Sequence, residues 1–263
     1  MKIKIIAVFI SLLGTLLISS SVYHKQEAAQ PGYKIFVLMG QSNMAGRGQL
    51  NDEFLQKKHP RVKVLTAEMT WKIAQHPLHF DKPKLAGVGP GLSFGQVLAE
   101  AYPRDTIALV PCAVGGTSIA KWEKGAYDKN TDTQPYKDAV RRIRAARKSG
   151  EIAGVIWLQG EADSREDRAK VYNEKLLNFI KNIRREVQDP ALPFVLGEIG
   201  HFRSRYDLIN KELRKVPSLD ANVSLVTAEN LNHKGDTTHF DSNSAEQYGI
   251  RFGNKMVEML NRN

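Results

Sequence analysis

Hydrophobic residues along this chain fall into two alternating patterns. Short apolar runs rich in β-branched residues predict buried strands, and they occupy residues 34–39, 62–66, 105–110, 152–158, 194–199 and 223–227. Apolar residues at three- and four-residue spacing predict amphipathic helices between them, at residues 92–102, 138–148, 166–187 and 245–261. Ser244 and Gln247 have the spacing of a capping box, which predicts that the last helix begins at Ser244.

This alternation of strands and helices predicts an α/β fold. A strand followed by a helix and another strand gives a parallel sheet with helices packed on its faces. We therefore expect a three-layer α/β/α sandwich with a central parallel sheet. The carboxyl ends of parallel strands share one edge of the sheet, and such folds bind their ligands there.

The first residues predict an export signal. Lys2 and Lys4 precede an apolar stretch of 14 residues from Ile5 to Ile18, which three serines follow. A membrane-spanning helix needs about 20 apolar residues, so residues 1–21 predict a cleaved signal peptide and a secreted or periplasmic protein. Retention of this segment as an N-terminal membrane anchor stays open as the alternative.

Length and composition fit one enzyme-sized domain over residues 32–263. The chain has 263 residues, of which 42% are hydrophobic, so it can bury a full core. Its net charge of +10 brings nucleic-acid binding into consideration. The basic residues are spread along amphipathic stretches such as 141–144 and 181–185, as on a solvated helix face, so we expect no nucleic-acid partner. Cys112, the only cysteine, follows an apolar run and is expected to be a buried, inert thiol.

Ser42 is a candidate nucleophile because of its position in the strand pattern. It follows the apolar run 34–39 and lies between Gly40 and Gly46, where the chain can turn tightly and a helix can begin. A serine there is exposed at the carboxyl end of the strand, near backbone N–H groups that can stabilise an anion. The alternative is that Ser42 or Asn43 only caps a helix, and this segment alone favours the cap.

Asp236 and His239 supply the groups that a serine nucleophile requires. A Ser hydroxyl is a weak nucleophile at neutral pH and needs a base such as His, whose ordinary pKa is about 6.5. A carboxylate then holds the imidazole tautomer and stabilises the imidazolium. Asp236 and His239 are three residues apart in one short segment, so their side chains can meet locally. For this pair alone, a surface turn or a helix cap is the alternative.

Four blocks of the sequence resemble the SGNH hydrolase superfamily, specifically the sialic-acid-specific acetylesterase-like group that includes carbohydrate esterase family six. The blocks follow the order of that family, and the resemblance covers residues 34 to 252. They are Gly40-Gln41-Ser42-Asn43, Val114-Gly115-Gly116-Thr117-Ser118-Ile119 with Trp122, Trp157-Leu158-Gln159-Gly160-Glu161-Ala162-Asp163, and Asp236-Thr237-Thr238-His239-Phe240.

The resemblance implies an SGNH, flavodoxin-like fold and a serine esterase that needs neither a metal nor a cofactor. It implies that Ser42 is the nucleophile, His239 the base and Asp236 the acid. In some members of the group the glutamate that corresponds to Glu161 shares or takes over the role of the acid, so Glu161 is the second candidate. The alternative is a structural Glu161 that caps a helix or pairs with an arginine.

Three groups are candidates for the oxyanion hole: the backbone N–H groups of Ser42 and Gly116 and the side-chain amide of Gln159. The resemblance implies the role of Gly116, and it sets Gln159 where the superfamily has its oxyanion-hole asparagine. From the residues alone, Gly116 and Gln159 follow the apolar runs 106–110 and 155–158 and so lie at strand ends. An ordinary turn and a polar strand tip are the alternatives.

Four other residues are candidate contacts of the substrate. Gln41 and Asn43 flank the serine, Arg47 could bind hydroxyls or a carboxylate, and Trp122 could stack on a sugar ring. For Arg47 and Trp122, a surface charge and a packing aromatic are the alternatives.

The irregular segment 67–91 is expected to lie over the site, since loops of this length are often functional. It contains His76 and His79, which are too few for a metal site without a convergent cysteine or carboxylate set. The sequence therefore favours two surface histidines and no metal.

Together these features predict a serine esterase that removes O-acetyl groups from a carbohydrate through an acetyl-serine intermediate. The substrate would be an acetylated xylan-type polysaccharide or a sialic acid. A general short-chain carboxylesterase or lipase and a non-catalytic carbohydrate-binding protein are the alternatives. A membrane partner is expected only if the N-terminal segment is retained as an anchor.

Overall fold

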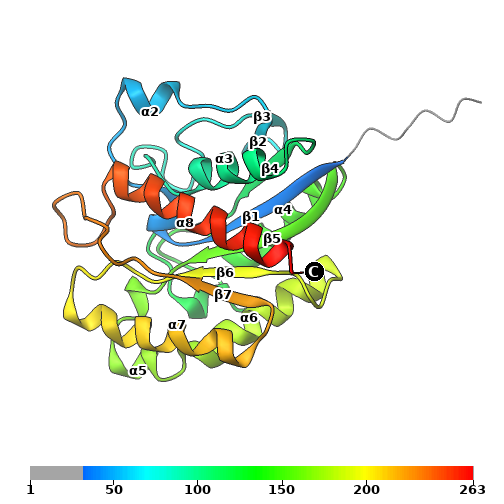
Figure 1. Cartoon of the computed structure of the whole chain (residues 1–263). Helices are drawn as coiled ribbons and strands as arrows, with labels where there is room; N and C mark the ends of the chain where they lie inside the picture. The colour runs from blue at the N-terminus through cyan, green and yellow to red at the C-terminus, as the bar shows by residue number, and fades with distance from the viewer. Residues whose placement is uncertain (1–31, 263) are drawn as a thin grey trace, which may run out of the picture. The chain divides into compact units, whose positions relative to one another are not determined.

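One sheet of seven strands forms the centre of the molecule (Figure 1). The computed structural model describes residues 32–262, so the expected signal peptide at 1–21 lies outside the described residues. The strands are β1 Tyr33–Gly40, β2 Val62–Leu65, β3 Trp71–Ile73, β4 Ile107–Pro111, β5 Gly150–Leu158, β6 Phe194–Gly197 and β7 Val223–Val226. Within the described residues their order across the sheet is β3-β2-β4-β1-β5-β6-β7.

The sheet is parallel apart from one edge. β1 lies in the middle and pairs in parallel with β4 and β5, and its residues from Ile35 to Gly40 are all buried. Every strand that the apolar runs predict is present. The sequence pattern does not predict β3, which pairs antiparallel with β2. β3 has three residues and is largely exposed, so it has no buried apolar run that could reveal it.

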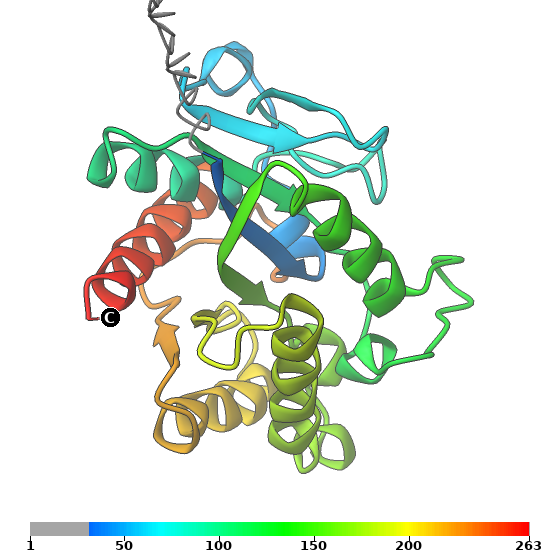
Figure 2. The same cartoon turned by 90° about the vertical axis from the view of Figure 1, so that its right-hand side faces the viewer.

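Helices cover both faces of the sheet, as Figure 2 shows, with α3 and α8 in teal and red on the left and α4 and α6 in green and yellow-green on the right. α3 (Gly91–Ala101) and α8 (Ser242–Leu260) share one hydrophobic cluster with the sheet. α4 (Pro135–Ala146), α6 (Tyr172–Val187) and α7 (Asp207–Leu219) share the other. The predicted three-layer α/β/α sandwich is therefore confirmed.

Short helical segments complete the chain. They are the helices α1 Ser42–Ala45, α2 Asp52–Gln56 and α5 Glu166–Ala169, and the 3-10 turns Ile119–Trp122, Glu161–Asp163 and Ser204–Tyr206. Over residues 32–262, no helix is both long enough and apolar enough to cross a membrane.

Three helices differ from the sequence prediction. The helix expected at 166–187 is divided into α5 and α6, because the chain leaves the helical conformation at Val171 (φ −108°, ψ 4°). α8 begins at Ser242 rather than Ser244, since the Asp241 side chain accepts a hydrogen bond from the Ser244 N–H at 2.7 Å and caps the helix. α7 is not predicted, although Ile209, Leu213 and Val216 recur at helical spacing and are all buried ahead of Pro217.

Candidate active site

Ser42 lies at the carboxyl end of the central strand. β1 ends at Gly40, whose φ of 135° favours glycine. A Cβ atom at this position would come within 2.0 Å of the carbonyl oxygen of Leu158 on β5. The chain therefore turns sharply against β5, and Ser42 follows as the first residue of α1.

Ser42, His239 and Asp236 form a continuous line of hydrogen-bonded side chains. Ser42 Oγ lies 3.0 Å from His239 Nε2, and His239 Nδ1 lies 2.7 Å from Asp236 Oδ2. His239 and Asp236 come from the segment between β7 and α8, and we call its residues 229–241 the base loop. It is the orange loop that projects at the left of Figure 1. The three sequence candidates are thus in contact, in the order that nucleophile, base and acid require.

Hydrogen bonds from the base loop keep Asp236 ionised. Burial acts to raise its pKa, but the N–H and side chain of His239 and the N–H of Thr238 outweigh it and lower the pKa to about 2. The two N–H groups reach Asp236 Oδ1 at 2.8 and 2.9 Å. An ionised Asp236 accepts the Nδ1 proton of His239, so Nε2 is left to accept the proton of Ser42.

His239 is uncharged at neutral pH. Burial lowers its pKa below the ordinary 6.5, and the neighbouring Asp236 offsets this only in part. A neutral imidazole beside a serine hydroxyl can remove the hydroxyl proton. The protonation state of His239 therefore suits a general base.

A pocket of about 350 Å³ opens in front of Ser42 and His239. Its other lining residues include Gln41, Lys82, Gly116, Arg203 and Arg205. A larger hollow of about 970 Å³ lies against α4 and the 124–134 segment. That hollow contains neither Ser42 nor His239, so the smaller pocket is the candidate active site.

Two backbone N–H groups at the pocket are free to bind an anion. Among the described residues, neither the N–H of Ser42 nor that of Gly116 donates a hydrogen bond. Both residues line the pocket. Gly116 has a φ of 90°, which glycine adopts without strain and other residues rarely do. Both groups therefore fit the predicted oxyanion hole.

A buried ion pair at the pocket wall holds Gly115 of the glycine block in place. Asp81 Oδ2 accepts a hydrogen bond from Arg47 Nη2 at 2.6 Å and from the Gly115 N–H at 2.8 Å. The side chains of Arg47 and Asp81 are only 4% and 3% exposed. Arg47 also donates to the carbonyl oxygen of Gly46 at 2.7 Å. Arg47, a candidate substrate contact, is thus engaged by the protein itself at the pocket wall.

Asp81 is a site residue that the sequence analysis missed. Burial acts to raise its pKa, but the Arg47 guanidinium outweighs this and holds the pKa below its usual value. It occurs in the irregular segment 67–91, where a single aspartate has no distinguishing neighbours. The sequence indicates a role for Asp81 only through the general expectation that this segment lies over the site. Lys82 and Leu85 of the same segment do line the pocket.

Gln159 does not occupy the oxyanion hole, contrary to its predicted role. Its side chain is fully buried and does not line the pocket. Its amide nitrogen donates to Asp163 Oδ2 at 2.6 Å, to the Thr117 carbonyl oxygen at 3.1 Å and to Gln41 Oε1 at 3.2 Å. With three acceptors for two N–H bonds, this amide has none left for a substrate.

Gln41 presents the amide that Gln159 does not. Gln41 Oε1 faces the Gln159 amide and, at 3.5 Å, the N–H groups of Gly160 and Ala162. Because these donors fix the oxygen, the amide nitrogen of Gln41 is on the other side of its group. Among the described residues, nothing accepts a hydrogen bond from that nitrogen, and Gln41 lines the pocket.

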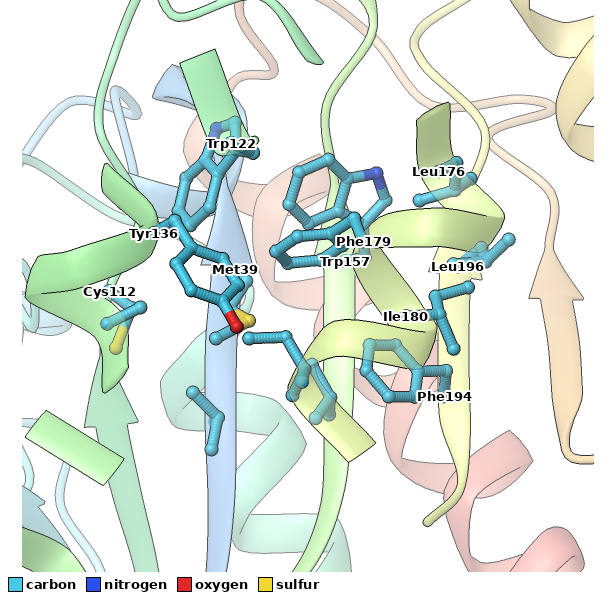
Figure 3. Close-up of a cluster of buried hydrophobic side chains, with 14 of the residues drawn as sticks. Met39, Cys112, Trp122, Tyr136, Trp157, Leu176, Phe179, Ile180, Phe194 and Leu196 are labelled. Atoms are coloured by element: carbon cyan, nitrogen blue, oxygen red, sulfur yellow. The ribbon is translucent and has the colours of Figure 1, made fainter. Parts of the chain in front are cut away.

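Trp122 is a core residue, so its predicted stacking on a sugar is wrong. It has no exposed surface, and Figure 3 shows it inside the cluster that contains Trp157 and Phe179. Its ring meets that of Trp157 edge to face, with 5.2 Å between the centroids. Its indole N–H donates to Thr117 Oγ1 at 3.1 Å. The alternative of a packing aromatic is the correct one.

Asn43 and Glu161 are hydrogen-bonded to each other, and of the two only Glu161 lines the pocket. Asn43 is buried, does not line the pocket and donates from Nδ2 to Glu161 Oε1 at 2.5 Å. The predicted substrate contact at Asn43 is therefore replaced by contacts within the protein. Glu161 forms no hydrogen bond with His239 among the described residues, whereas Asp236 does. The geometry thus favours Asp236 as the carboxylate partner of the base.

Arg203 is a further residue that the sequence analysis did not identify. It donates from Nε to the carbonyl oxygen and Oγ1 of Thr237, and from Nη2 to the Asp236 carbonyl oxygen and Thr238 Oγ1. These bonds fasten the base loop to the 3-10 turn Ser204–Tyr206. No signal in the sequence distinguishes it from other surface arginines.

His76 and His79 are buried, so their predicted surface location is wrong. They are 4% and 5% exposed, and burial lowers the pKa of each to about 4. In the described part of the chain, no three His, Cys, Asp or Glu side chains converge as a metal site would require.

Cys112 is buried as predicted, and burial raises the pKa of its thiol to about 12, which leaves it unreactive.

The three-layer α/β/α fold and the hydrogen-bonded line of Ser42, His239 and Asp236 fit an esterase of the SGNH type. Residues 32–258 match the family of carbohydrate esterases described as sialic acid-specific acetylesterase, and the chain belongs to this family. The resemblance inferred from the sequence blocks is therefore confirmed, and with it the class of enzyme, a carbohydrate O-acetylesterase.

Individual relatives agree with the family. The chain is 34% identical over 239 residues to the probable carbohydrate esterase At4g34215 of Arabidopsis thaliana, and the match covers 84% of this chain and 88% of that protein. The X-ray structure of the Arabidopsis protein matches with a TM-score of 0.78 at 32% identity, over 87% of this chain and 99% of the other.

The crystal structure of NanS shares the fold, with a TM-score of 0.71 at 20% identity over 90% of this chain and all of NanS. So does XAC1771, described as a carbohydrate acetylesterase from Xanthomonas citri, with a TM-score of 0.68 at 19% identity. That match covers 88% of this chain and 57% of XAC1771.

Proposed function

We propose that Ser42 removes O-acetyl groups from a carbohydrate through an acetyl-serine intermediate. Ser42 Oγ attacks the acetyl carbonyl while His239 Nε2 takes its proton, and His239 then returns the proton to the departing sugar hydroxyl. Water, activated by His239, next attacks the acetyl-serine and releases acetate. The observation that carries this proposal is the 3.0 Å contact between Ser42 Oγ and His239 Nε2.

Asp236 is the acid of this mechanism. Its contact of 2.7 Å with His239 Nδ1 holds the imidazole with Nε2 toward Ser42. Its low pKa keeps it negative, so it stabilises the imidazolium that forms when Ser42 attacks.

The oxyanion hole consists of the N–H groups of Ser42 and Gly116 and the amide nitrogen of Gln41. All three residues line the pocket, and their donors are unused among the described residues. Losing one such donor typically costs about 3 kcal/mol of transition-state stabilisation. Gln159 contributes indirectly, by holding the oxygen of Gln41.

Charge around the pocket favours an acidic sugar over neutral xylan. Lys82, Arg203 and Arg205 all line the pocket, and none of them pairs with a carboxylate among the described residues. A substrate carboxylate beside these cations would be stabilised. An O-acetylated sugar acid such as a sialic acid is therefore the proposed substrate class.

The enzyme acts outside the cytoplasm, either secreted or periplasmic, in this proposal. Residues 1–21 support it through their basic start and short apolar stretch. A mature N-terminus near residue 22, measured by mass spectrometry of protein from the native host, would support export with cleavage. An intact N-terminus in the membrane fraction would instead show a retained anchor.

Release of acetate from matched substrates tests the function. We expect acetate from O-acetylated sialic acids and slower release from acetylated xylan. With the p-nitrophenyl acetyl ester, a burst of p-nitrophenol would show the acetyl-enzyme. Faster hydrolysis of butyrate or octanoate esters would indicate a general carboxylesterase or lipase, and binding without acetate release would indicate a non-catalytic carbohydrate-binding protein.

A further inference from the structure

Glu161 is a buried carboxyl group at the pocket that the mechanism above leaves unused. It lines the pocket, yet it is only 8% exposed. Its Oε1 accepts a hydrogen bond from Asn43 Nδ2 at 2.5 Å, while its Oε2 is buried without any partner in the described structure. A buried carboxylate with so few partners is strongly disfavoured relative to the neutral acid.

Asn43, the partner of Glu161, connects the nucleophile to the base loop. It directly follows Ser42 in the sequence. Its Nδ2 also donates to the Thr238 carbonyl oxygen at 3.0 Å, and its Oδ1 accepts from the Phe240 N–H at 3.1 Å. Thr238 and Phe240 are the two neighbours of His239. Asn43 therefore holds the backbone on both sides of the base, and Glu161 holds Asn43.

We propose that Glu161 is a positioning residue that works as a neutral carboxylic acid: through Asn43 it fixes the distance between Ser42 and His239. It is not a second carboxylate partner of His239. The inference rests on the proposed function, because it concerns the geometry of the nucleophile and base.

The surroundings of Glu161 favour the neutral form. Burial raises its pKa to about 7, against the hydrogen bonds from Asn43 and from the backbone of its own turn. Other titratable or charged groups near it or around the pocket are Asp163 on the same turn, Tyr172 on α6, Tyr248 on α8, Asp236 and His239 on the base loop, and Arg47, Lys82, Arg203 and Arg205.

Ionisation of Glu161 would oppose the reaction. It adds a negative charge to the pocket in which the oxyanion of the transition state develops, and like charges repel strongly where water is excluded. The neutral acid is therefore the active form, and activity is lost as pH rises through the pKa of Glu161.

The pH dependence of kcat/KM in wild type and Glu161→Gln is the first test. Gln keeps an oxygen that can accept from Asn43 but cannot ionise. We expect wild type to lose activity above about pH 7 and Glu161→Gln to lack this alkaline limb, with kcat at pH 6 lowered no more than about threefold. Glu166→Gln, at an exposed position on α5, removes the same charge and should leave the limb in place.

Glu161→Ala separates positioning from charge. It removes the acceptor of Asn43, so we expect kcat to fall about tenfold or more with little change in KM, and Gln at the same position to restore most of the loss. A loss of about 10³-fold in Glu161→Gln at every pH would overturn the proposal, since it would make the negative charge essential. An unchanged alkaline limb in Glu161→Gln would overturn it as well.

Infrared difference spectra provide a readout that does not need activity. The spectrum of wild type minus that of Glu161→Gln should show the C=O stretch of a protonated carboxylic acid at pH 6. This band should disappear by pH 8. Its absence at pH 6 would contradict the proposal even in an active enzyme. A wild-type protein that shows this band but releases no acetate would refute the proposed function and leave the neutral Glu161 standing.

Discussion

Ser42 Oγ and His239 Nε2 are 3.0 Å apart although 197 residues of sequence separate them. The contact exists because Ser42 follows the central strand β1 and His239 lies on the loop before the last helix, and both segments reach the same edge of the sheet. The proposed mechanism requires this contact, because proton transfer from Ser42 to His239 needs the two atoms within hydrogen-bond distance.

Ser42→Ala should abolish acetate release and leave the fold intact. The methyl group cannot attack an ester, and the Ser42 side chain contributes only its contact with His239 to the described hydrogen bonds. We expect kcat to fall by about 10⁴-fold or more. Ser218→Ala, on the exposed side of α7, is the control. The losses in Ser42→Ala and His239→Ala should not add in the double variant, and additive losses would indicate separate roles.

Asp236→Asn should lower kcat by up to about 10⁴-fold with KM nearly unchanged. The asparagine lacks the negative charge that stabilises the imidazolium. Its amide N–H can also face His239 Nδ1–H, which needs a hydrogen-bond acceptor there. Steady-state kinetics in parallel with Glu161→Gln tests the assignment of the acid. If Glu161→Gln is the more damaging change in folded protein, the acid is Glu161, and Asp236 only shapes the base loop.

Glu161 should make the protein less stable at alkaline pH. Its pKa is raised from 4.5 to about 7, so its contribution to the free energy of unfolding is fully present below pH 4.5 and is lost as pH rises through 7. The loss is on the order of 3 kcal/mol. Urea unfolding at pH 4.5 and 8 should show this decline in wild type relative to Glu161→Gln. Equal declines in the two proteins would contradict the raised pKa.

Asp81→Ala should destabilise the fold and slow the reaction. It leaves the buried charge of Arg47 unpaired, at a cost of about 3–5 kcal/mol, and it frees the Gly115 N–H beside the proposed oxyanion hole. Thermal unfolding and kcat measure the two effects. Asp167→Ala breaks the exposed Arg165–Asp167 pair and should change stability by less than about 1 kcal/mol. Similar stability changes in both variants would refute a structural role of the buried pair.

Neutral substitutions at the pocket rim should weaken binding of acidic sugars only. Lys82→Gln and Arg205→Gln should each raise KM for an O-acetylated sialic acid about threefold, as expected for the ~0.7 kcal/mol of an exposed ion pair. KM for p-nitrophenyl acetate should stay constant, and added salt should reduce the difference between wild type and variants. Lys170→Gln, an exposed site outside the pocket, is the control. Equal effects on both substrates would argue against a carboxylate at the rim.

The sequence predicted the strands at 34–39 and 152–158 because a central parallel strand must be apolar on both faces. It did not predict β3, whose exposed residues lack that pattern. It placed the start of α8 at Ser244, where the Asp241 side chain in fact caps a helix that begins at Ser242. Several residue types can cap a helix, and the backbone decides which one does.

Local spacing determined one part of the site from the sequence alone. Asp236 and His239 are three residues apart, so their contact needs only a short turn, and a serine directly after an apolar strand reaches the edge of the sheet in any parallel fold. Only the tertiary structure determined where the side chains of Gln159 and Trp122 lie. Both residues lie near the site in the sequence pattern. In the structure, however, the Gln159 side chain points into a buried hydrogen-bond network, and the Trp122 side chain packs in the core. Direction and burial of a side chain follow from backbone dihedrals and from neighbours distant in sequence, which residue spacing does not encode.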